Sequence, residues 1–307
     1  MVKRLLRYLG RGRWSRLRQA AGVCFPEASF MAIMEAQQGF GPFCTLSFDC
    51  DFPRDVEALP EVCSLLEQYG VAASFACIGQ WVQRYPAEHR CLVEAGFELL
   101  NHTQTHPNLY HPDYAYARGA DLSRKRFDLL VPREKRAEIE EAHATFVEVL
   151  GYAAYGFRTP HFGTLHTPEV YPILSELKYR FSSSVMAGAS PRGGIPYQAG
   201  GGVWEFPLSP CPAHPFGVLD SWHSLSKRDP AHGRPGELTS LFVRLGEQVQ
   251  GRGGYVNIYL DPRDALDSGE LRRILDYLRH SGLVVLNYAD LLERILADPT
   301  RHLFSGT

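Results

Sequence analysis

Short apolar runs alternate with segments of helical spacing from residue 43 onward. The runs at 43–48 (FCTLSF) and 71–79 (VAASFACIG) predict strands, and the segment between them ends in Gly70, as a helix would. The clearest helix is expected over 132–151, which opens with proline and acids and closes with glycine. About seven repeats of strand and helix predict an α/β fold whose largely parallel sheet can close into a barrel.

The same pattern predicts the remaining elements of the barrel. Further strands are expected at 97–102, 154–160, 179–185, 202–208, 254–260 and 283–288, and further helices at 55–70, 87–96, 168–178, 237–249 and 269–282, with one last helix after them. Residues 108–131 form an irregular excursion rich in Tyr, Asp and Arg. We see no long linker or internal repeat. We therefore expect a basic N-terminal extension (1–40), one catalytic-sized domain (41–298) and a short tail (299–307).

Two acids stand at the end of the first predicted strand. The stretch TLSFDCDFPRD places Asp49 and Asp51 one residue apart. Side chains alternate across a strand, so both carboxylates can share one face while Cys50 points away. In parallel barrels, ligand chemistry gathers at this C-terminal end of the strands. Two like charges so close repel unless a cation or a proton lies between them, which favours metal binding or acid–base chemistry. A loop-capping Asp-x-Asp is the structural alternative.

Two further strand ends carry residues of the same kind of chemistry. His102 and His106, in FELLNHTQTHPNL, are spaced i, i+4, which brings two imidazoles to one metal where the backbone turns or is helical. Two histidines and a carboxylate with an open position make catalytic zinc-type sites. In FRTPHFG, Arg158 would hold a neighbouring carboxylate ionised and oriented. Its alternative is a surface ion pair of little energetic weight.

The ordered set SFDCD, NHTQTH and FRTP resembles the first three motifs of the polysaccharide deacetylase family, the NodB-homology domain or carbohydrate esterase family four. The resemblance covers about residues 43–290, and it is to the members that carry Asp-x-Asp. It implies a distorted (β/α)7 barrel, in agreement with the units counted above. It also implies a divalent metal cofactor, zinc above all, with cobalt, nickel or iron as alternatives.

The resemblance also implies a role for each motif residue. Asp49 would be the general base, and Arg158 would orient it. The backbone N–H of His161, which follows Pro160 in the motif, would help to stabilise the oxyanion. The metal would be held by three side chains: Asp51, His102 and His106.

The chain departs from the family where the leaving amine must be protonated. Family members usually offer a His at the end of a late strand, and the matching segment here, NIYLDPRDALD, has Asp261. Upstream, FSSSV places Ser182 where many relatives carry an acid. Asp261 would still serve as the acid if burial raised its pKa. The alternatives are that His214 or His223, from the segment SPCPAHPFGVLDSWH, takes over, or that hydrolysis is impaired.

The candidate substrate-binding residues include an aromatic side chain. Trp204 could stack on a sugar ring, although aromatics near strand ends more often belong to the core or the rim. The full candidate set is Pro160, His161, Trp204, His214 and His223.

Together these residues predict metal-assisted hydrolysis of an N-acyl amide. The expected substrate is an N-acylated, chiefly N-acetylated, amino sugar in a glycan, an oligosaccharide or a lipid-linked saccharide. One alternative is an amidohydrolase acting on a non-sugar cyclic amide or ureide. Another is a catalytically impaired homologue that binds metal or glycan.

Composition and charge narrow the partners and the location. The net charge of −2 gives no reason to expect a nucleic-acid partner. Residues 1–19 carry seven basic residues and no acid, which fits a solvated basic tail, a helix docked on its own domain, or contact with an anionic membrane or a partner. Seven scattered cysteines and the lack of an apolar signal region favour the cytoplasm, with any membrane contact on the inner face. The oligomeric state is left open.

Overall fold

The computed structural model describes residues 23–107, 126–163, 166–226 and 230–299. The basic segment 1–19, most of the excursion at 108–131 and nearly all of the tail lie outside the described residues. Among the described residues, no helix is both long and apolar enough to cross a bilayer.

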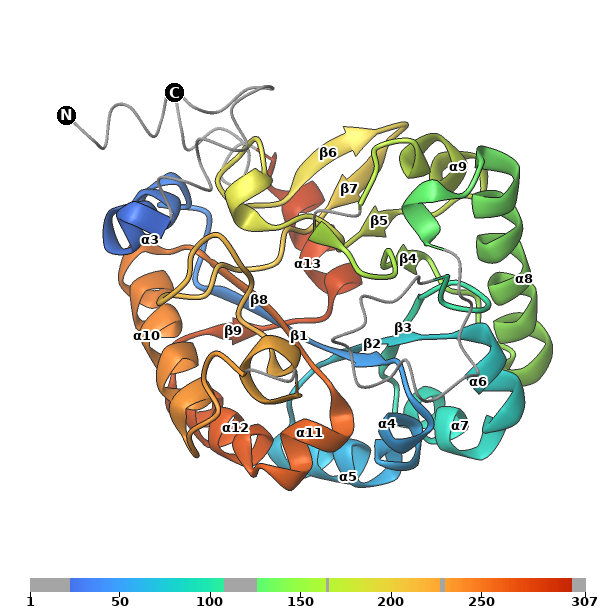
Figure 1. Ribbon diagram of the computed structural model, residues 1–307, viewed down its shortest axis with the longest axis horizontal. Helices are drawn as coiled ribbons and strands as arrows, with labels where there is room; N and C mark the ends of the chain where they lie inside the picture. The colour runs from blue at the N-terminus through green and yellow to red at the C-terminus, as the bar shows by residue number, and fades with distance from the viewer. Residues whose placement is uncertain (1–22, 108–125, 164–165, 227–229, 300–307) are drawn as a thin grey trace.

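The described strands form one curled sheet wrapped by helices (Figure 1). Its order is β6-β7-β5-β4-β3-β2-β1-β8, and β9 also pairs with β1. All pairings are parallel except the β6–β7 hairpin. The expected α/β class and distorted barrel are therefore confirmed. The strands are β1 (Phe43–Cys50), β2 (Ser74–Cys77), β3 (Glu98–Asn101), β4 (Gly156–Phe157), β5 (Phe181–Ser182), β6 (Tyr197–Gly200), β7 (Val203–Glu205), β8 (Tyr255–Leu260) and β9 (Val284–Val285).

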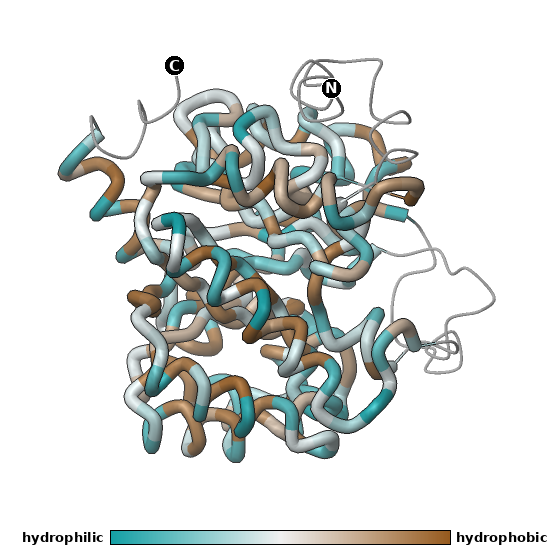
Figure 2. Tube along the Cα trace, turned by 90° about the vertical axis from the view of Figure 1, so that its left-hand side faces the viewer, coloured by the Kyte–Doolittle hydropathy of each residue, from teal (hydrophilic) through white to brown (hydrophobic). Residues whose placement is uncertain are grey.

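The helices cover the outside of this sheet, and most are amphipathic. Brown and teal positions alternate along the helices in Figure 2, as expected when one side faces the sheet and the other faces water. The helices are α3 (Pro26–Ala36), α4 (Pro53–Glu57), α5 (Leu59–Tyr69), α6 (Gly79–Arg84), α7 (Pro86–Glu94), α8 (Pro132–Leu150), α9 (Val170–Glu176), α10 (Glu237–Arg252), α11 (Pro262–Asp267), α12 (Glu270–His280) and α13 (Tyr288–Ala297).

Two differences from the predicted elements have local causes. The helix expected over 55–70 is divided into α4 and α5, and Pro60 lies in the first turn of α5, where its missing N–H costs nothing. The strands expected at 154–160 and 179–185 shrink to two residues each. Beyond Phe157, side-chain hydrogen bonds take the place of the backbone hydrogen bonds between strands. The Thr159 N–H donates to Ser184 Oγ, and the Ser184 N–H donates to Glu205 Oε1.

The barrel is distorted between β7 and β8, which do not pair as strands in the described sheet. The segment after β7 bridges the gap instead. The Ser209 N–H donates to the Asn257 carbonyl at 2.8 Å, and the Asn257 N–H donates to Ser209 Oγ at 2.9 Å. Farther on, Asp220 forms a parallel bridge with Tyr259. This segment is thereby held beside the C-terminal end of β8.

The interior of the barrel is filled from the side where the strands begin. Trp204 packs there with Phe43, Phe181 and Tyr255 and with the apolar face of α13. Only 5% of Trp204 is exposed. The expected sugar-stacking residue is thus a core residue near the strand starts, whereas ligand chemistry gathers at the strand ends.

The structure also describes part of the expected N-terminal extension. In α3, Phe30 and Met34 are buried against the domain. The next residue after α3, Gln37, accepts from the Tyr255 N–H at 3.1 Å and donates to the Gly193 carbonyl at 3.1 Å. Residues 26–40 therefore pack as an integral part of the barrel, although the sequence pattern placed them outside it.

Candidate active site

The two acids of the opening motif lie where strand alternation predicts. Asp49 is the penultimate residue of β1, in register with Ala76 of β2, and Asp51 follows the strand directly. Only 3% of Asp49 is exposed. The Trp81 indole donates to the Asp51 carbonyl at 3.0 Å and fixes the backbone at this turn. Cys50 between them is fully buried in the core on the other side of the sheet, as expected.

Arg158 and Asp49 form a completely buried ion pair. Arg158 Nη1 donates to Asp49 Oδ1 at 2.5 Å, and the arginine side chain is 0% exposed. This contact agrees with the expectation that Arg158 orients the carboxylate. It does not agree with the alternative of a surface ion pair, because both side chains are buried. Burial raises the pKa of Asp49, and the guanidinium opposes that rise. The guanidinium holds the buried Asp49 carboxylate in one orientation and supplies its counter-charge in the absence of water.

The rest of the guanidinium is satisfied by a polar network inside the barrel. Arg158 donates to the Ser183 carbonyl at 3.0 Å, to Ser183 Oγ at 3.0 Å and to the Tyr288 hydroxyl at 2.8 Å. Tyr288 in turn donates to Asn257 Oδ1 at 2.7 Å. Sequence reasoning missed Ser183, Asn257 and Tyr288. The one available signal was Asn257, a lone amide within the otherwise apolar strand YVNIYL.

Asp51, His102 and His106 meet with the spacing of metal ligands. His102 Nε2 lies 3.3 Å and His106 Nε2 lies 3.5 Å from the same oxygen, Asp51 Oδ1. Tetrahedral bonds of 2.0–2.1 Å to one ion separate neighbouring ligand atoms by about 3.3–3.5 Å. Asp51 Oδ1 and both ring nitrogens of His106 are buried without a hydrogen-bond partner among the described residues. Such orphaned atoms fit a bound cation, so the residues present fit the metal that the motif implies.

The two histidines differ in their surroundings. His102 Nδ1 lies 2.8 Å from the Arg158 carbonyl, and its Nε2 faces Asp51. Burial lowers the pKa of His102, but the Asp51 carboxylate outweighs burial and raises it. Burial lowers the pKa of His106 to about 3, so its imidazole is neutral. The turn between the two histidines is strained, with φ of 68° at Thr103 and 50° at His106. Strain of this kind is typical of functional sites.

The motif residues after Arg158 lie against the same triad. Pro160 is buried, and His161 has a φ of 49°. The His161 ring lies 5.4 Å from the His106 ring, centroid to centroid, and burial lowers the pKa of His161 to about 4. The structure therefore brings His161 to the site and turns its backbone sharply there.

Asp261 is buried directly after β8, the strand that pairs with β1 and places Leu260 opposite Phe48. It is 3% exposed, and Ser221 Oγ donates to its Oδ2 at 2.6 Å. Burial raises its pKa well above the ordinary range, the nearby Asp55 adds to the rise, and the Ser221 hydroxyl opposes it. This environment favours the protonated form of the Asp261 carboxyl group. Ser221 was not found from the sequence.

His223 and His214 take different places on the segment after β7. His223 forms a dyad with the fully buried Asp220: its N–H donates to Oδ1 at 2.6 Å, and its Nδ1 lies 2.7 Å from Oδ2. The ring remains 47% exposed. His214 instead stacks on His232, with centroids 5.1 Å apart. Of the two expected stand-ins for the missing histidine, His223 alone has a carboxylate partner among the described residues, as a proton-transfer group requires.

A small apolar surface adjoins the Asp49–Arg158 pair. The Phe162 and Tyr259 rings meet edge to face at 5.0 Å, and the guanidinium carbon lies 6.0 and 5.7 Å from their centroids. The same cluster includes Leu208, Val218, Met186 and Trp222. Trp222 is only partly buried, which leaves an aromatic side chain at the rim.

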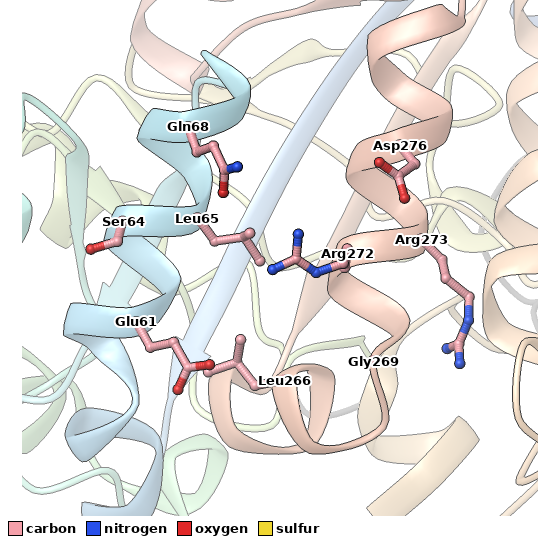
Figure 3. Close-up of a pocket in the computed structure, with 9 residues that line it drawn as sticks. All are labelled: Glu61, Ser64, Leu65, Gln68, Leu266, Gly269, Arg272, Arg273 and Asp276. Atoms are coloured by element: carbon pink, nitrogen blue, oxygen red, sulfur yellow. The ribbon is translucent and has the colours of Figure 1, made fainter.

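A groove lies elsewhere on the molecule and takes no part in this site. It has a volume of about 450 Å³ and lies between α5 and α12 on the outside of the barrel (Figure 3). Acidic and basic side chains both line it, among them Glu61, Arg272 and Asp276. None of the candidate site residues lines this groove.

Two histidines and two acids thus meet at the strand ends of an α/β barrel, and comparison with known proteins shows what this chain resembles. Residues 41–182 match the family model described as polysaccharide deacetylase. Over this part of its length the chain is similar to polysaccharide deacetylases.

Individual relatives agree with this similarity. The chain is 38% identical over 71 residues to a chitooligosaccharide deacetylase of Bradyrhizobium sp., a match that covers 23% of this chain and 26% of that protein. The chain thus spans about a quarter of the length of this curated relative. A polysaccharide deacetylase homologue from Mycobacterium smegmatis shares the fold with a TM-score of 0.63 at 18% identity, over 84% of this chain and 92% of that one.

A further structural relative is a pseudoenzyme. The carbohydrate esterase family four pseudoenzyme from Bacillus anthracis aligns with a TM-score of 0.52 at 16% identity, over 82% of this chain and 66% of that one. At this identity the likeness shows the fold alone. Whether a given chain of this fold is active must therefore be decided from its own residues.

Proposed function

We propose that this protein is a metal-dependent hydrolase that removes an N-acyl group, chiefly acetyl, from an amino sugar. The observation that carries the proposal is the buried Arg158–Asp49 pair beside a triad with orphaned ligand atoms. Holding a metal needs only the triad. A fully buried, oriented carboxylate next to it is what a general base requires, and it argues against a metal-binding role alone.

The residues divide the chemistry of amide hydrolysis among them. A divalent ion, zinc in our proposal, would be held by Asp51, His102 and His106 and would polarise the acyl carbonyl. Asp49 takes the proton of the attacking water, and Arg158 keeps the accepting oxygen aimed at it. The backbone N–H of His161 donates to the oxyanion that develops on the carbonyl oxygen. In our proposal the methyl group of the acyl chain packs against the apolar surface of Phe162 and Tyr259.

Protonation of the leaving amine is assigned to Asp261. Its buried, protonated carboxyl group can donate to the nitrogen as the carbon–nitrogen bond breaks, and Ser221 then stabilises the carboxylate that remains. The Asp220–His223 dyad is the competing donor, since its ring is more exposed and already carries a carboxylate partner. The two candidates are distinguished by mutation, as set out in the Discussion.

The proposed substrate class rests on the relatives. The curated relative is a chitooligosaccharide deacetylase, which supports an N-acetylated sugar as the substrate here. In our proposal the sugar is free, oligomeric or lipid-linked, and the reaction takes place in the cytoplasm or on the inner membrane face. A cyclic amide or ureide is the second candidate, supported by the Asp-x-Asp arrangement.

The direct experiment is to measure acetate released from N-acetylglucosamine and chitooligosaccharides by metal-reconstituted protein. We expect release by the parent protein and none by Asp49→Asn carrying the same amount of metal. Asp261→His, which restores the usual family residue, is assayed in parallel. Activity in Asp261→His alone would mean that the parent is a binding protein that has lost its acid. Silence of both on sugars, with turnover of a cyclic imide by the parent, would favour the second candidate.

A further inference from the structure

A second group of metal-ligating side chains lies outside the candidate active site. Cys211 and His214 belong to the segment after β7, and His232 precedes α10. Cys211 Sγ lies 3.2 Å from His232 Nε2, and one ligand atom from each residue lies within 4.8 Å of the other two. A tetrahedral zinc ion, with bonds of 2.3 Å to sulfur and 2.0–2.1 Å to nitrogen, sets its sulfur and nitrogen ligands about 3.5 Å apart.

The backbone around Cys211 is folded as a ligand-bearing turn. The His214 N–H donates to the Cys211 carbonyl at 3.1 Å, and the Cys211 N–H donates to the Gly217 carbonyl at 3.2 Å. Burial raises the pKa of the Cys211 thiol, while the N–H groups of His214 and Ala213 act against that rise.

The third side chain is oriented by an acid of its own. His232 is 6% exposed, and its Nδ1 lies 3.9 Å from Glu237 Oε1 at the start of α10. A carboxylate beside one ring nitrogen directs the other toward a metal ligand site, and here the other nitrogen faces the sulfur.

A Cys–His pair can also be a nucleophile and its base, but this one is placed for a different task. Cys211 is 3% exposed, so a substrate carbon has no access to its sulfur. A nucleophilic pair would also leave the stacked ring of His214 without a role. A sulfur and two imidazoles converging on one point are the ligands of a thiophilic ion.

We propose that Cys211, His214 and His232 bind a zinc ion that is separate from the Asp51–His102–His106 triad. Its position gives it a structural effect on the active site. The bridges from Pro210 to Val218 and from Asp220 to Tyr259 place the same segment over the end of β8. Tying residues 211 and 214 to residue 232 fixes the loop that presents Ser221 and His223. The ion therefore holds the proton-donating side of the mouth in place.

Cobalt substitution separates this site from the catalytic one. Co²⁺ bound by a thiolate gives a charge-transfer band in the near ultraviolet, whereas Co²⁺ bound only by Asp and His does not. We expect the parent protein to bind about two equivalents of Co²⁺ and to show the band. Cys211→Ser should lose the band and about one equivalent. His106→Ala should lose about one equivalent and keep the band.

Matched variants keep the test decisive. Cys24→Ser removes an exposed cysteine and should change neither the band nor the stoichiometry. His214→Ala should weaken cobalt binding at this site at least about tenfold while circular dichroism stays unchanged, which covers the case that Cys211→Ser fails to fold. The proposal is overturned if the parent shows no thiolate band, or if the band survives in both Cys211→Ser and His214→Ala. Neither outcome depends on deacetylase activity.

Discussion

The two sides of the candidate active site are held by different means. Asp49, His102 and Arg158 stand at the ends of β1, β3 and β4, which belong with β2 to one run of parallel strands whose register fixes their spacing. Asp261 follows β8, the strand beside the gap in the barrel, and His223 lies on the segment that bridges this gap; side-chain hydrogen bonds join them to Ser221 and Asp220. The family match also ends at residue 182, before this second side begins. Parallel pairing in the sheet fixes the residues of the first side. The segment that bridges the gap between β7 and β8 leaves more freedom in which residue donates the proton.

The largest expected effect is on the sheet-held side. Asp49→Asn should reduce kcat by about 10³-fold or more, because an amide cannot take up the proton of water. The Arg158 contact can pass to the amide oxygen, so the fold and the metal should both be retained. Parallel assays of acetate release and metal content check this.

Asp51→Ala is the matched contrast, because it should lose the metal as well as the activity. Near-parental turnover by Asp49→Asn would refute its assignment as the base.

The next effect tests the side held by the bridging segment. Asp261→Asn should lower kcat by about 10²-fold on N-acetyl sugars, and much less on acetanilides, whose leaving amine needs less protonation. His223→Ala should stay within about threefold of the parent on both substrates. Steady-state kinetics with both amides decide between the donors. The reverse pattern would assign proton donation to His223 and its dyad with Asp220.

A smaller effect is expected where the two sides touch. Tyr288→Phe removes the hydroxyl that accepts from Arg158 and donates to Asn257, so kcat should fall by about tenfold while KM is unchanged. The same variant should lose about 1–2 kcal/mol of unfolding free energy, since it leaves buried partners unsatisfied. Urea unfolding measures this loss. Tyr277→Phe is a control, because its hydroxyl has no hydrogen-bond partner among the described residues. Equal losses in both variants would remove the special role of Tyr288.

The last prediction concerns the pH dependence of stability and leaves turnover aside. Glu98, on β3, accepts from the N–H groups of Tyr288 and Ala289 at 3.1 and 2.9 Å, and burial raises its pKa to about 7. Because the folded-state pKa lies above the unfolded one, the cost of ionising this acid is absent below about pH 4.5 and grows as pH rises to 7. The parent should thus lose up to about 3 kcal/mol of stability relative to Glu98→Gln between pH 4.5 and 8.

Thermal unfolding of both proteins across this pH range is the measurement. If the parent instead became more stable relative to Glu98→Gln as pH rises, the two N–H donors would stabilise the ionised carboxylate more than burial destabilises it.

The sheet-held side was largely predictable from the sequence, and the other side was not. Alternation along one strand suffices to place Asp49 and Asp51 on one face, and the strand-end rule brings the motifs together. Tyr288 could not be found this way, because its bond to Arg158 joins residues 130 positions apart. Trp204 was misplaced because periodicity tells that a strand residue is buried, but not at which end of the barrel. The dyad of Asp220 and His223 depends on a loop whose course no repeating pattern encodes.

The distance along the chain between the partners of Arg158 has a consequence for biosynthesis. Asp49 is made 109 residues before Arg158, and Tyr288 follows 130 residues after it. During translation, the first strands leave the ribosome with Asp49 and the two histidines before Arg158 and α13 have been made. The acid then has no counter-charge, and the interior of the barrel is not yet packed. Only when α13 emerges can it pack into the interior of the barrel and bring Tyr288, the last partner of the Arg158 guanidinium. The nascent chain is therefore expected to stay inert until its final helix docks, so that catalytic competence is the last property the protein acquires.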